Sequence, residues 1–242
     1  MSWSETAVMN ESLPIGAALA DWSPPPPPGP LELQGDVVRL ERLRSDHGAS
    51  LFDAFSVDRQ GRLWTYMPHG PFDQEAALLA WIDSVAASAD PFFYAIIDAA
   101  TGRACGVASY LRIQPDAGSI EVGWISYAPE LQRTRAATEA MFLMMRWAFE
   151  AGYRRYEWKC DALNAASRRA AERLGFTFEG VFRQATVVKG RNRDTAWFAM
   201  IDGEWPALRQ AYEIWLDPSN FDGQGQQRQS LGTLSRSALE HP

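Results

Sequence analysis

The stretch SIEVGWISYAPELQRTRAATEA, residues 119–140, joins a strand-like run directly to a long helix-like run. The first part has a strand pattern, and Pro129 stops it. In the helix that follows, Met141 and Ala148 recur at helical spacing and Gly152 ends the run. The stretch therefore predicts a strand, a short loop and a helix in direct succession.

The junction between this strand and this helix has the features of an anion site. The first backbone N–H groups of a helix are unpaired, and together with the helix dipole they form a site for phosphate. Thr134 is the predicted N-cap, and Thr138 adds a hydroxyl group one turn later. The small side chains of Ala136 and Ala137 would let a ligand approach the backbone. An ordinary capped helix explains the same residues, and from this stretch alone it is the simpler interpretation.

The remaining chain alternates strand and helix patterns. Strand patterns cover residues 36–43, 91–98, 104–113, 154–162 and a hairpin over 180–201. Helix patterns cover residues 45–56, 73–88, 164–176 and 204–216. With the stretch above, the order β-α-α-β-β-β-α-β-α-β-β predicts a mixed α/β domain over residues 31–216.

The two ends of the chain differ in composition from this domain. Residues 1–30 form a Pro-rich N-terminal extension ending in WSPPPPPGP, whose five consecutive prolines force a polyproline II conformation. This arm either lies over the domain with Trp22 as its anchor or is a disordered leader, and its composition fits both. Residues 217–242 form a polar C-terminal tail that contains DGQGQQRQS.

The composition of the 242 residues argues against several classes of function. A net charge of −7 argues against a nucleic-acid-binding protein, which normally has a basic face. Cys105 and Cys160 lie far apart in apolar surroundings, and without a signal peptide they indicate reduced cysteines of a cytoplasmic protein. No apolar run reaches the length of about 18 residues that a membrane span needs. The three histidines, His47, His69 and His241, show no metal-ligand spacing, so no metal site is expected.

Four short motifs follow one another at a characteristic spacing. They are ATEA at residues 137–140, NAASRRAAERLGFTFEGVFR at 164–183, GRNRD at 190–194 and EW at 204–205. Their order resembles the GNAT N-acetyltransferase superfamily, in particular its RimJ/RimL-like branch, over residues 31–216. The resemblance implies a GNAT-like central mixed, mostly antiparallel sheet flanked by helices. It also implies acetyl-CoA as co-substrate and an amine as the acetyl acceptor.

The resemblance further implies which residues bind the co-substrate. The pantetheine arm would lie along the strand at Ile125, Ser126 and Tyr127, and Asn164 would donate a hydrogen bond to it. The pyrophosphate would lie on the N–H groups of the loop, which comprises Gln132, Arg133, Thr134, Arg135, Ala136, Ala137 and Thr138. By itself, an asparagine that opens a helix is most often only its N-cap, and the two roles of Asn164 are compatible.

The loop departs from the family pattern at two positions. The family's loop usually has glycines in the register of Arg133 and Arg135. Without glycine the loop loses freedom at positive φ, so its backbone is expected to follow another path. Two guanidinium groups are gained, and guanidinium pairs well with phosphate oxygens. We therefore expect the loop to bind CoA with the help of both arginines; the alternative is that both side chains point into solvent.

Two residues are candidates for proton transfer. Glu121 stands in the register of a glutamate common in this branch, and a carboxylate there could take the amine proton directly or through water. Its neighbours Ile120 and Val122 indicate partial burial, which would raise its pKa, and an ion pair with a basic residue is an equal alternative. Many GNAT enzymes have a tyrosine acid where this chain has Ala171. Ser167 therefore becomes the candidate donor to the thiolate, with a solvent-facing serine as the alternative.

The resemblance implies that the aromatic loop WTYMPHGPF, between the first two helices, lines the acceptor pocket. Trp64, Tyr66 and His69 would shape this pocket, and core packing is the alternative for Trp64. The hairpin that faces this loop in the family contains three basic residues: Lys189, Arg191 and Arg193. A basic rim repels a cationic polyamine and favours a peptide or an amino-acid-like amine.

The favoured function is an acetyl-CoA-dependent N-acetyltransferase in which a primary amine attacks the thioester directly. The lost loop glycines and the missing tyrosine favour an alternative, a catalytically silent acyl-CoA-binding module. A third interpretation is an interaction protein that presents its proline arm to an aromatic-lined groove. The sequence leaves a homodimer open and does not identify the acceptor amine.

Overall fold

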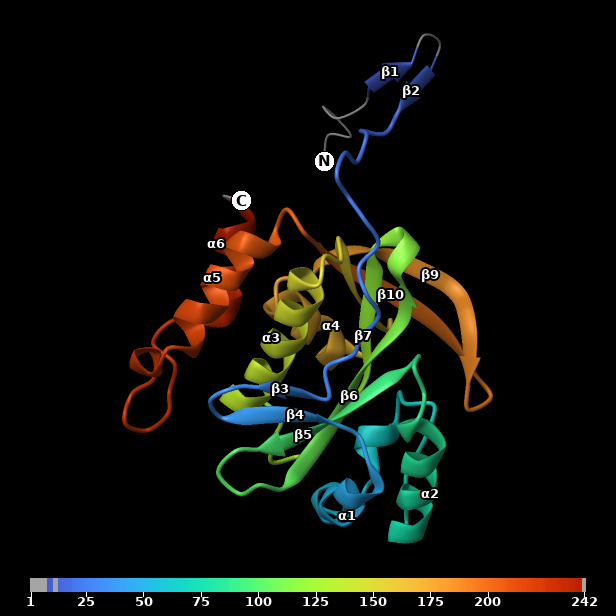
Figure 1. Ribbon diagram of the computed structural model, residues 1–242. Coiled ribbons are helices and arrows are strands. Elements are labelled where there is room, and N and C mark those ends of the chain that lie inside the picture. The colour runs from blue at the N-terminus through green and yellow to red at the C-terminus, as the bar shows by residue number, and fades with distance from the viewer. Residues whose placement is uncertain (1–7, 11–12, 241–242) are drawn as a thin grey trace.

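An eight-stranded sheet forms the centre of the computed structural model, which describes residues 8–10 and 13–240 (Figure 1). Its strands lie in the order β3 (Glu32–Gln34), β4 (Val38–Arg42), β5 (Phe92–Asp98), β6 (Ala104–Gln114), β7 (Ser119–Tyr127), β8 (Arg155–Asp161), β10 (Arg191–Ile201) and β9 (Thr177–Val188). All neighbouring strands are antiparallel except β7 and β8, which are parallel. This arrangement confirms the mixed, mostly antiparallel sheet expected from the sequence. A separate hairpin of β1 (Val8–Asn10) and β2 (Leu13–Ile15) precedes the sheet.

Helices cover both faces of the sheet, and the alternation of side chains along the strands supplies both cores. One core contains α1 (Gly48–Ser56) and α2 (Glu75–Ala86), and the other contains α3 (Arg135–Glu150), α4 (Ala165–Arg173) and α5 (Trp205–Leu216). Along β5, Phe93 and Ala95 belong to the first core, whereas Tyr94 and Ile96 belong to the second. Because successive side chains of a strand point to opposite faces, this buried strand serves both cores.

The order of elements from β4 to β10 is the predicted one, β-α-α-β-β-β-α-β-α-β-β. Short 3₁₀ helices occur in the connections: η1 (Ser45–His47), η2 (Arg62–Trp64), η3 (Pro115–Ala117) and η4 (Pro218–Asn220). Within the described ranges, no helix is long and apolar enough to cross a membrane. No cluster of metal-ligating side chains occurs in that part of the chain either.

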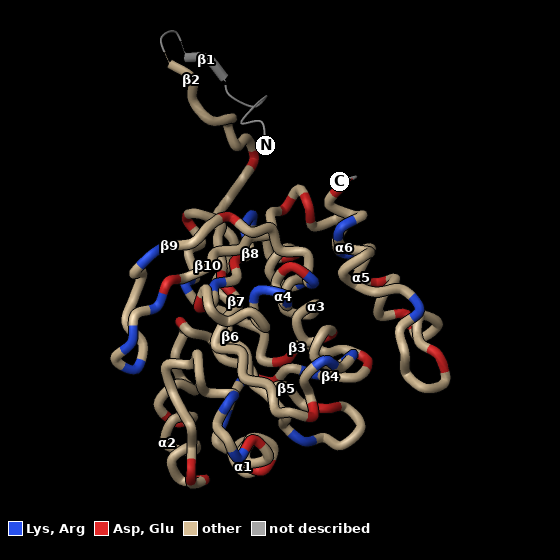
Figure 2. Tube along the Cα trace, turned by 180° about the vertical axis from the view of Figure 1, so that it is seen from behind, with Lys and Arg blue, Asp and Glu red and all other residues tan. Residues whose placement is uncertain are grey.

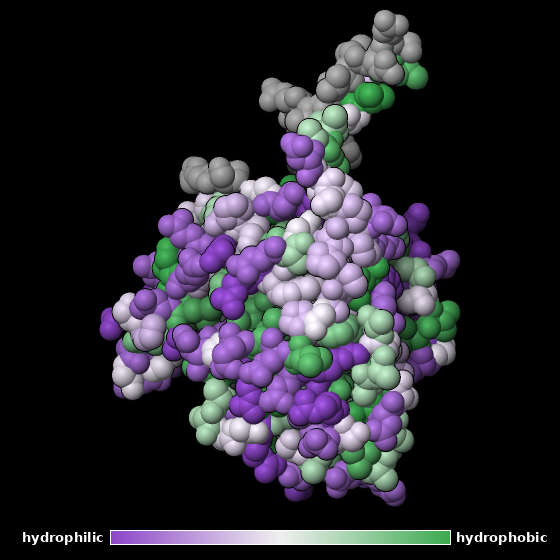
Figure 3. All heavy atoms as spheres, in the orientation of Figure 1, coloured by the Kyte–Doolittle hydropathy of each residue, from purple (hydrophilic) through white to green (hydrophobic). Residues whose placement is uncertain are grey.

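The proline segment of the N-terminal arm lies on the domain, and the β1–β2 hairpin projects beyond it (Figures 1 and 3). Pro25 and Pro28 are buried, and their spacing of three residues is one turn of a polyproline II helix. The Tyr153 hydroxyl donates a hydrogen bond of 3.1 Å to the Pro26 carbonyl, and Trp22 is half-buried. One face of the arm from Trp22 onward is therefore covered by the domain, in line with the first of the two interpretations.

The segment after α5 was expected to be a polar tail. The structure differs, because part of this segment forms a helix that packs onto the domain. The segment contains η4 and α6 (Leu231–Glu240), and Leu231 is completely buried. The buried Ser235 hydroxyl donates a hydrogen bond of 3.4 Å to the Arg173 carbonyl at the end of α4. The helix has apolar residues at helical spacing: Leu231, Leu234, Ala238 and Leu239. The sequence analysis did not predict this helix because the polar run DGQGQQRQS that precedes it dominates the composition of the segment.

Candidate active site

β7 and β8 separate at the place where the pantetheine strand was predicted. The two strands pair only over residues 119–122, and beyond that point β8 pairs with β10 alone. Trp124, with a φ of 51°, lies in a bulge of β7 directly before Ile125. In the described chain, no strand pairs with the edge of Ile125 to Tyr127 that faces away from β6. On this edge the Tyr127 carbonyl accepts a hydrogen bond of 3.0 Å from the Gln132 side-chain amide. The remaining backbone groups of the edge are available to a ligand that forms hydrogen bonds along a strand.

The loop after β7 presents unpaired backbone N–H groups at the start of α3. Thr134 is the N-cap, as predicted, and its Oγ1 accepts a hydrogen bond of 3.1 Å from the Ala137 N–H. The Gln132 N–H is also used, because it donates to the Ala128 carbonyl at 3.3 Å. Among the described residues, nothing accepts a hydrogen bond from the N–H groups of residues 133–136. The predicted pyrophosphate site therefore narrows to these residues at the helix N-terminus.

Arg133 adopts the left-handed backbone conformation although it is not a glycine. Its φ is 62°, so the expectation that the loop avoids positive φ is wrong at this position. A side chain with a Cβ atom is disfavoured there by about 1 kcal/mol, which the N-capped helix and the bulged strand on either side must offset. The side chain of Arg133 is exposed, so it can reach a phosphate group bound at the helix start.

Arg135 points away from this site, which corrects the expectation that both arginines bind CoA. Its guanidinium donates a hydrogen bond to the Leu216 carbonyl and lies 5.3 Å from the centroid of the Phe221 ring. Thr138 is buried as well, and its hydroxyl oxygen accepts a hydrogen bond of 3.2 Å from Arg173. The side chains of Arg135 and Thr138 therefore hold the helices together, and of the two arginines only Arg133 remains a candidate phosphate ligand.

We expect Arg133→Ala and Arg135→Ala to have different effects. Arg133→Ala should weaken CoA binding about 10-fold, because it removes one charge-assisted contact with phosphate, and should leave binding of unphosphorylated pantetheine unchanged. Arg135→Ala should lower the melting temperature, and any change in affinity should be the same for CoA and for unphosphorylated pantetheine. Calorimetry with both ligands and thermal denaturation measure these effects. Equal losses of both ligands in Arg133→Ala would contradict the assignment of its charge to phosphate.

The start of α4 has the predicted asparagine cap and a polarised serine. The Asn164 Oδ1 accepts a hydrogen bond of 3.1 Å from the Ser167 N–H, so the Asn164 amide nitrogen stays available as a donor to a ligand. The Trp158 indole N–H donates to the Ser167 hydroxyl oxygen at 3.0 Å. This contact uses a lone pair of the serine oxygen and not the serine's own proton. Ala171, which replaces the tyrosine acid, is completely buried.

Glu121 is buried between its apolar neighbours, as expected, and it is also ion-paired. It is 3% exposed, and its Oε2 lies 2.6 Å from the Arg112 Nη1 and 3.0 Å from the Lys159 Nζ. Burial raises the pKa of Glu121, and the two cations oppose that rise. Both cations contact Oε2, which leaves Oε1 as the oxygen that can face an amine or a water molecule.

The aromatic loop between α1 and α2 packs against the bulge of β7. Trp64 is 4% exposed and belongs to the core, so the core-packing interpretation holds for it. The His69 ring stacks between Trp81 and Trp124, at centroid distances of 4.6 and 5.1 Å. Burial, followed by the charge of Lys189, lowers the pKa of His69 to about 4. His69 is therefore a neutral part of an aromatic wall next to the bulge.

Two further contacts hold this loop across the separated strands. The Tyr66 hydroxyl donates a hydrogen bond of 3.3 Å to the Leu163 carbonyl, in the turn before α4. The Lys189 ammonium, at the basic tip of the β9–β10 hairpin (Figure 2), donates to three loop carbonyls: those of Trp64 (2.9 Å), His69 (3.3 Å) and Gly70 (2.8 Å). The hairpin and the loop therefore lie side by side. The charge of Lys189 is used within the protein and is not part of a free basic rim.

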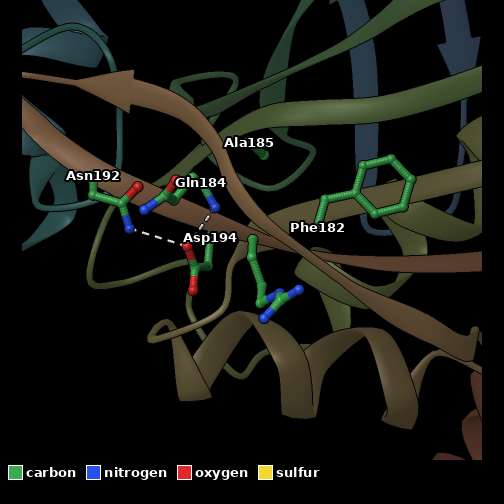
Figure 4. Close-up of a pocket in the computed structure, with 6 residues that line it drawn as sticks. Phe182, Gln184, Ala185, Asn192 and Asp194 are labelled. Carbon is green, nitrogen blue, oxygen red and sulfur yellow. Dashed lines mark hydrogen bonds between the residues drawn. The ribbon is translucent and has the colours of Figure 1, made fainter.

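A pocket of about 740 Å³ lies within the β9–β10 hairpin (Figure 4). It is lined by Phe182, Arg183, Gln184, Ala185, Asn192 and Asp194. The Asp194 carboxylate accepts hydrogen bonds from the Gln184 N–H (2.7 Å) and the Asn192 amide (3.0 Å), which stabilises a bulge in β9. None of the predicted site residues lines this pocket, so we do not assign it to acetyl-CoA.

Comparison with known proteins identifies the family to which this geometry belongs. The family model described as Acetyltransferase (GNAT) domain matches residues 38–177, more than half of the chain. The chain belongs to the GNAT acetyltransferase family. A GCN5-related N-acetyltransferase from Brucella melitensis is 49% identical with a TM-score of 0.88, covering 90% of this chain and 100% of that chain. A probable GNAT-family acetyltransferase from Chromobacterium violaceum ATCC 12472 is 42% identical with a TM-score of 0.75, covering 82% and 100%.

The relation to the RimJ/RimL-like branch is more distant than these matches. RimL, described as a ribosomal L7/L12 alpha-N-protein acetyltransferase, is 19% identical with a TM-score of 0.61, covering 70% of this chain and 93% of that chain. At this identity the match shows the GNAT fold alone. A comparison with curated proteins finds no match. GNAT acetyltransferases use acetyl-CoA, which agrees with the co-substrate expected from the sequence.

The sequence analysis missed two residues of this site and misassigned a third. Trp124 forms the bulge and Lys159 contacts Glu121, whereas Lys189, expected at a basic rim, binds carbonyls of the aromatic loop. Only Lys159 had a signal that could have been used: it stands two residues after Glu157, so both side chains lie on one face of β8. Nothing local in the sequence marks Trp124 as a bulge residue or shows where the Lys189 ammonium binds.

Proposed function

We propose that this GNAT protein is an acetyl-CoA-dependent N-acetyltransferase that acetylates the primary amine of a peptide or protein N-terminus or of an amino-acid-like molecule. The observation that carries the proposal is the set of unpaired N–H groups at residues 133–136 beside the unpaired edge of β7. A free strand edge suits the amides of pantetheine, and a helix N-terminus suits a pyrophosphate. Family membership favours this enzyme over the silent acyl-CoA-binding module. The motif order supports the RimJ/RimL-like branch.

The reaction would be a direct acyl transfer. The amine nitrogen attacks the carbonyl carbon of the thioester, the C–S bond breaks, and the electron pair leaves with the sulfur. A backbone N–H group near Ile125 stabilises the oxyanion. Glu121 takes the proton of the amine through Oε1, directly or through water, and Ser167 or a water molecule protonates the thiolate.

The acceptor would enter beside the aromatic loop and the β9–β10 hairpin. Because Lys189 is bound to the loop carbonyls, the basic charge left on this hairpin tip is that of Arg191 and Arg193. A cationic polyamine is still repelled there, so an amine with a carboxylate nearby remains the favoured acceptor. A cytoplasmic location and a homodimer stay predictions from the sequence.

The test is an assay of CoA release with a panel of amines, combined with calorimetry of acetyl-CoA. We expect a dissociation constant for acetyl-CoA of about 100 μM or below, in the ordinary range for such ligands. With amines at equal concentration, CoA release should be faster with an acidic peptide than with spermidine. No heat at millimolar acetyl-CoA would exclude both the enzyme and the binding module. Heat without turnover of any amine would favour the binding module, and a preference for spermidine would overturn only the acceptor class.

A further inference from the structure

A chain of charged side chains with alternating sign has its members on four strands of the sheet: β6, β7, β8 and β9. In order from β6 to β9, its members are Arg112, Glu121, Lys159, Glu157, Arg155 and Glu179. Each member is in salt-bridge contact with the next, at distances from 2.5 to 3.0 Å. Glu121, the proposed base, is thus one member of an extended set of coupled charges.

Lys159 is the buried centre of this chain. Its side chain is 4% exposed, and its Nζ lies 3.0 Å from the Glu121 Oε2 and 2.6 Å from the Glu157 Oε2. The Trp197 ring lies over the ammonium group, with the Nζ 3.8 Å from the ring centroid. One desolvated cation is therefore shared between two carboxylates, and it is closer to Glu157 than to Glu121.

The geometry points to Lys159 as the positioning residue that sets the ionisation of Glu121, with Glu157 as the carboxylate that competes for the same cation. This inference rests on the proposed function, because it gives Glu121 the role of the base. Burial disfavours an ionised carboxylate, so a base at this position needs a nearby cation to be deprotonated near neutral pH. A cation shared with Glu157 supplies only part of that stabilisation. The proton affinity of the base is thereby kept high enough for it to accept a proton.

The other charged groups near Glu121 act more weakly or act through Lys159. The Arg112 side chain is 57% exposed, so solvent and salt screen its charge much more than that of buried Lys159. The Asp90 carboxylate accepts hydrogen bonds from the backbone N–H groups of Arg112 and Ile113 and forms no ion pair with the Arg112 guanidinium in the described chain. Arg155 and Glu179 lie beyond Glu157, at the far end of the chain of charges. Replacement of Lys159 or Glu157 should therefore change the pKa of Glu121 more than replacement of any other residue of the chain of charges.

The test uses two variants with opposite expected signs. Lys159→Met removes the buried cation, so the pKa of Glu121 should rise by about 1 pH unit or more. Glu157→Gln removes the competing carboxylate and leaves the cation to Glu121, so the pKa of Glu121 should fall. Lys159→Arg keeps the charge and is the matched control. In Lys159→Arg the pKa of Glu121 should stay close to the wild-type value. If Lys159→Met does not fold, the comparison of Lys159→Arg with Glu157→Gln still tests the inference.

Two readouts separate this inference from the proposed function. The first is the titration of the Glu121 carboxyl carbon by NMR in protein with ¹³C-labelled glutamate, assigned by its loss in Glu121→Gln. The second is the acidic limb of the plot of kcat/KM against pH. Its midpoint should shift together with the NMR value, to higher pH in Lys159→Met and to lower pH in Glu157→Gln. An NMR titration unchanged in both variants would overturn the inference whether or not the enzyme is active. An NMR titration that moves while the acidic limb stays fixed would overturn the role of Glu121 as base, and with it the role of Lys159.

Discussion

A Glu121→Gln variant is expected to lose about 100-fold in kcat/KM near pH 6, the ordinary contribution of a general base, and to approach wild-type activity at high pH. The reason is that the amine must lose a proton before or during its attack. At low pH a protein carboxylate supplies that step, and at high pH the amine is already neutral. The pH profile of CoA release measures the effect. Calorimetry should show an acetyl-CoA affinity close to that of the wild type.

Ser167→Ala is the comparison for this variant. It removes a donor to the leaving thiolate, which water can partly replace, so we expect a loss of about 10-fold that depends little on pH. Thermal denaturation must accompany both measurements, because Glu121→Gln also leaves Lys159 with one carboxylate fewer. Wild-type turnover of both variants over the whole pH range would mean that positioning alone suffices and that neither residue transfers a proton.

A chain that ends at Asp217 is expected to melt about 10 °C below the full chain. The truncation removes α6 with the fully buried Leu231, exposes the end of α4 beneath it, and removes the Phe221 ring beside Arg135. Burial of one leucine and several partly buried apolar residues is worth about 4 kcal/mol. For a domain of this size, that loss of free energy corresponds to a change in melting temperature of this order. Thermal denaturation monitored by circular dichroism measures it.

A pair of leucine substitutions controls for the length of the chain. Leu231→Ala leaves a cavity in the core, so it should cost about 3 kcal/mol and account for much of the loss. Leu31→Ala changes a side chain that is 72% exposed, and it should leave the melting temperature almost unchanged. If the truncated chain were as stable as the full one, α6 would contribute nothing to the stability of the domain.

The order of strands and helices and the helix caps at the site could be read from the sequence because they depend on near neighbours. Thr134 and Asn164 each accept a hydrogen bond from a backbone N–H three residues ahead. The alternation along β5 and the helical spacing of α3 are likewise properties of short segments. Because a short motif contains this information, the fold class and the position of the junction between β7 and α3 followed from the residues themselves and from their resemblance to a family.

The sequence did not show which groups the long charged side chains contact, and only the tertiary structure identifies these partners. Arg135 bonds to a carbonyl 81 residues away and Lys189 to carbonyls 119 to 125 residues away, so neither side chain is free for a ligand. The shared position of Lys159 arises only because β8 lies beside β7 and Trp197 covers it from β10. The sequence determined which local elements form and where their caps lie, because those interactions close within one helical turn. Only the tertiary structure decides which charged side chains form contacts inside the protein and which remain available to a ligand. The reason is that their partners come from distant parts of the chain.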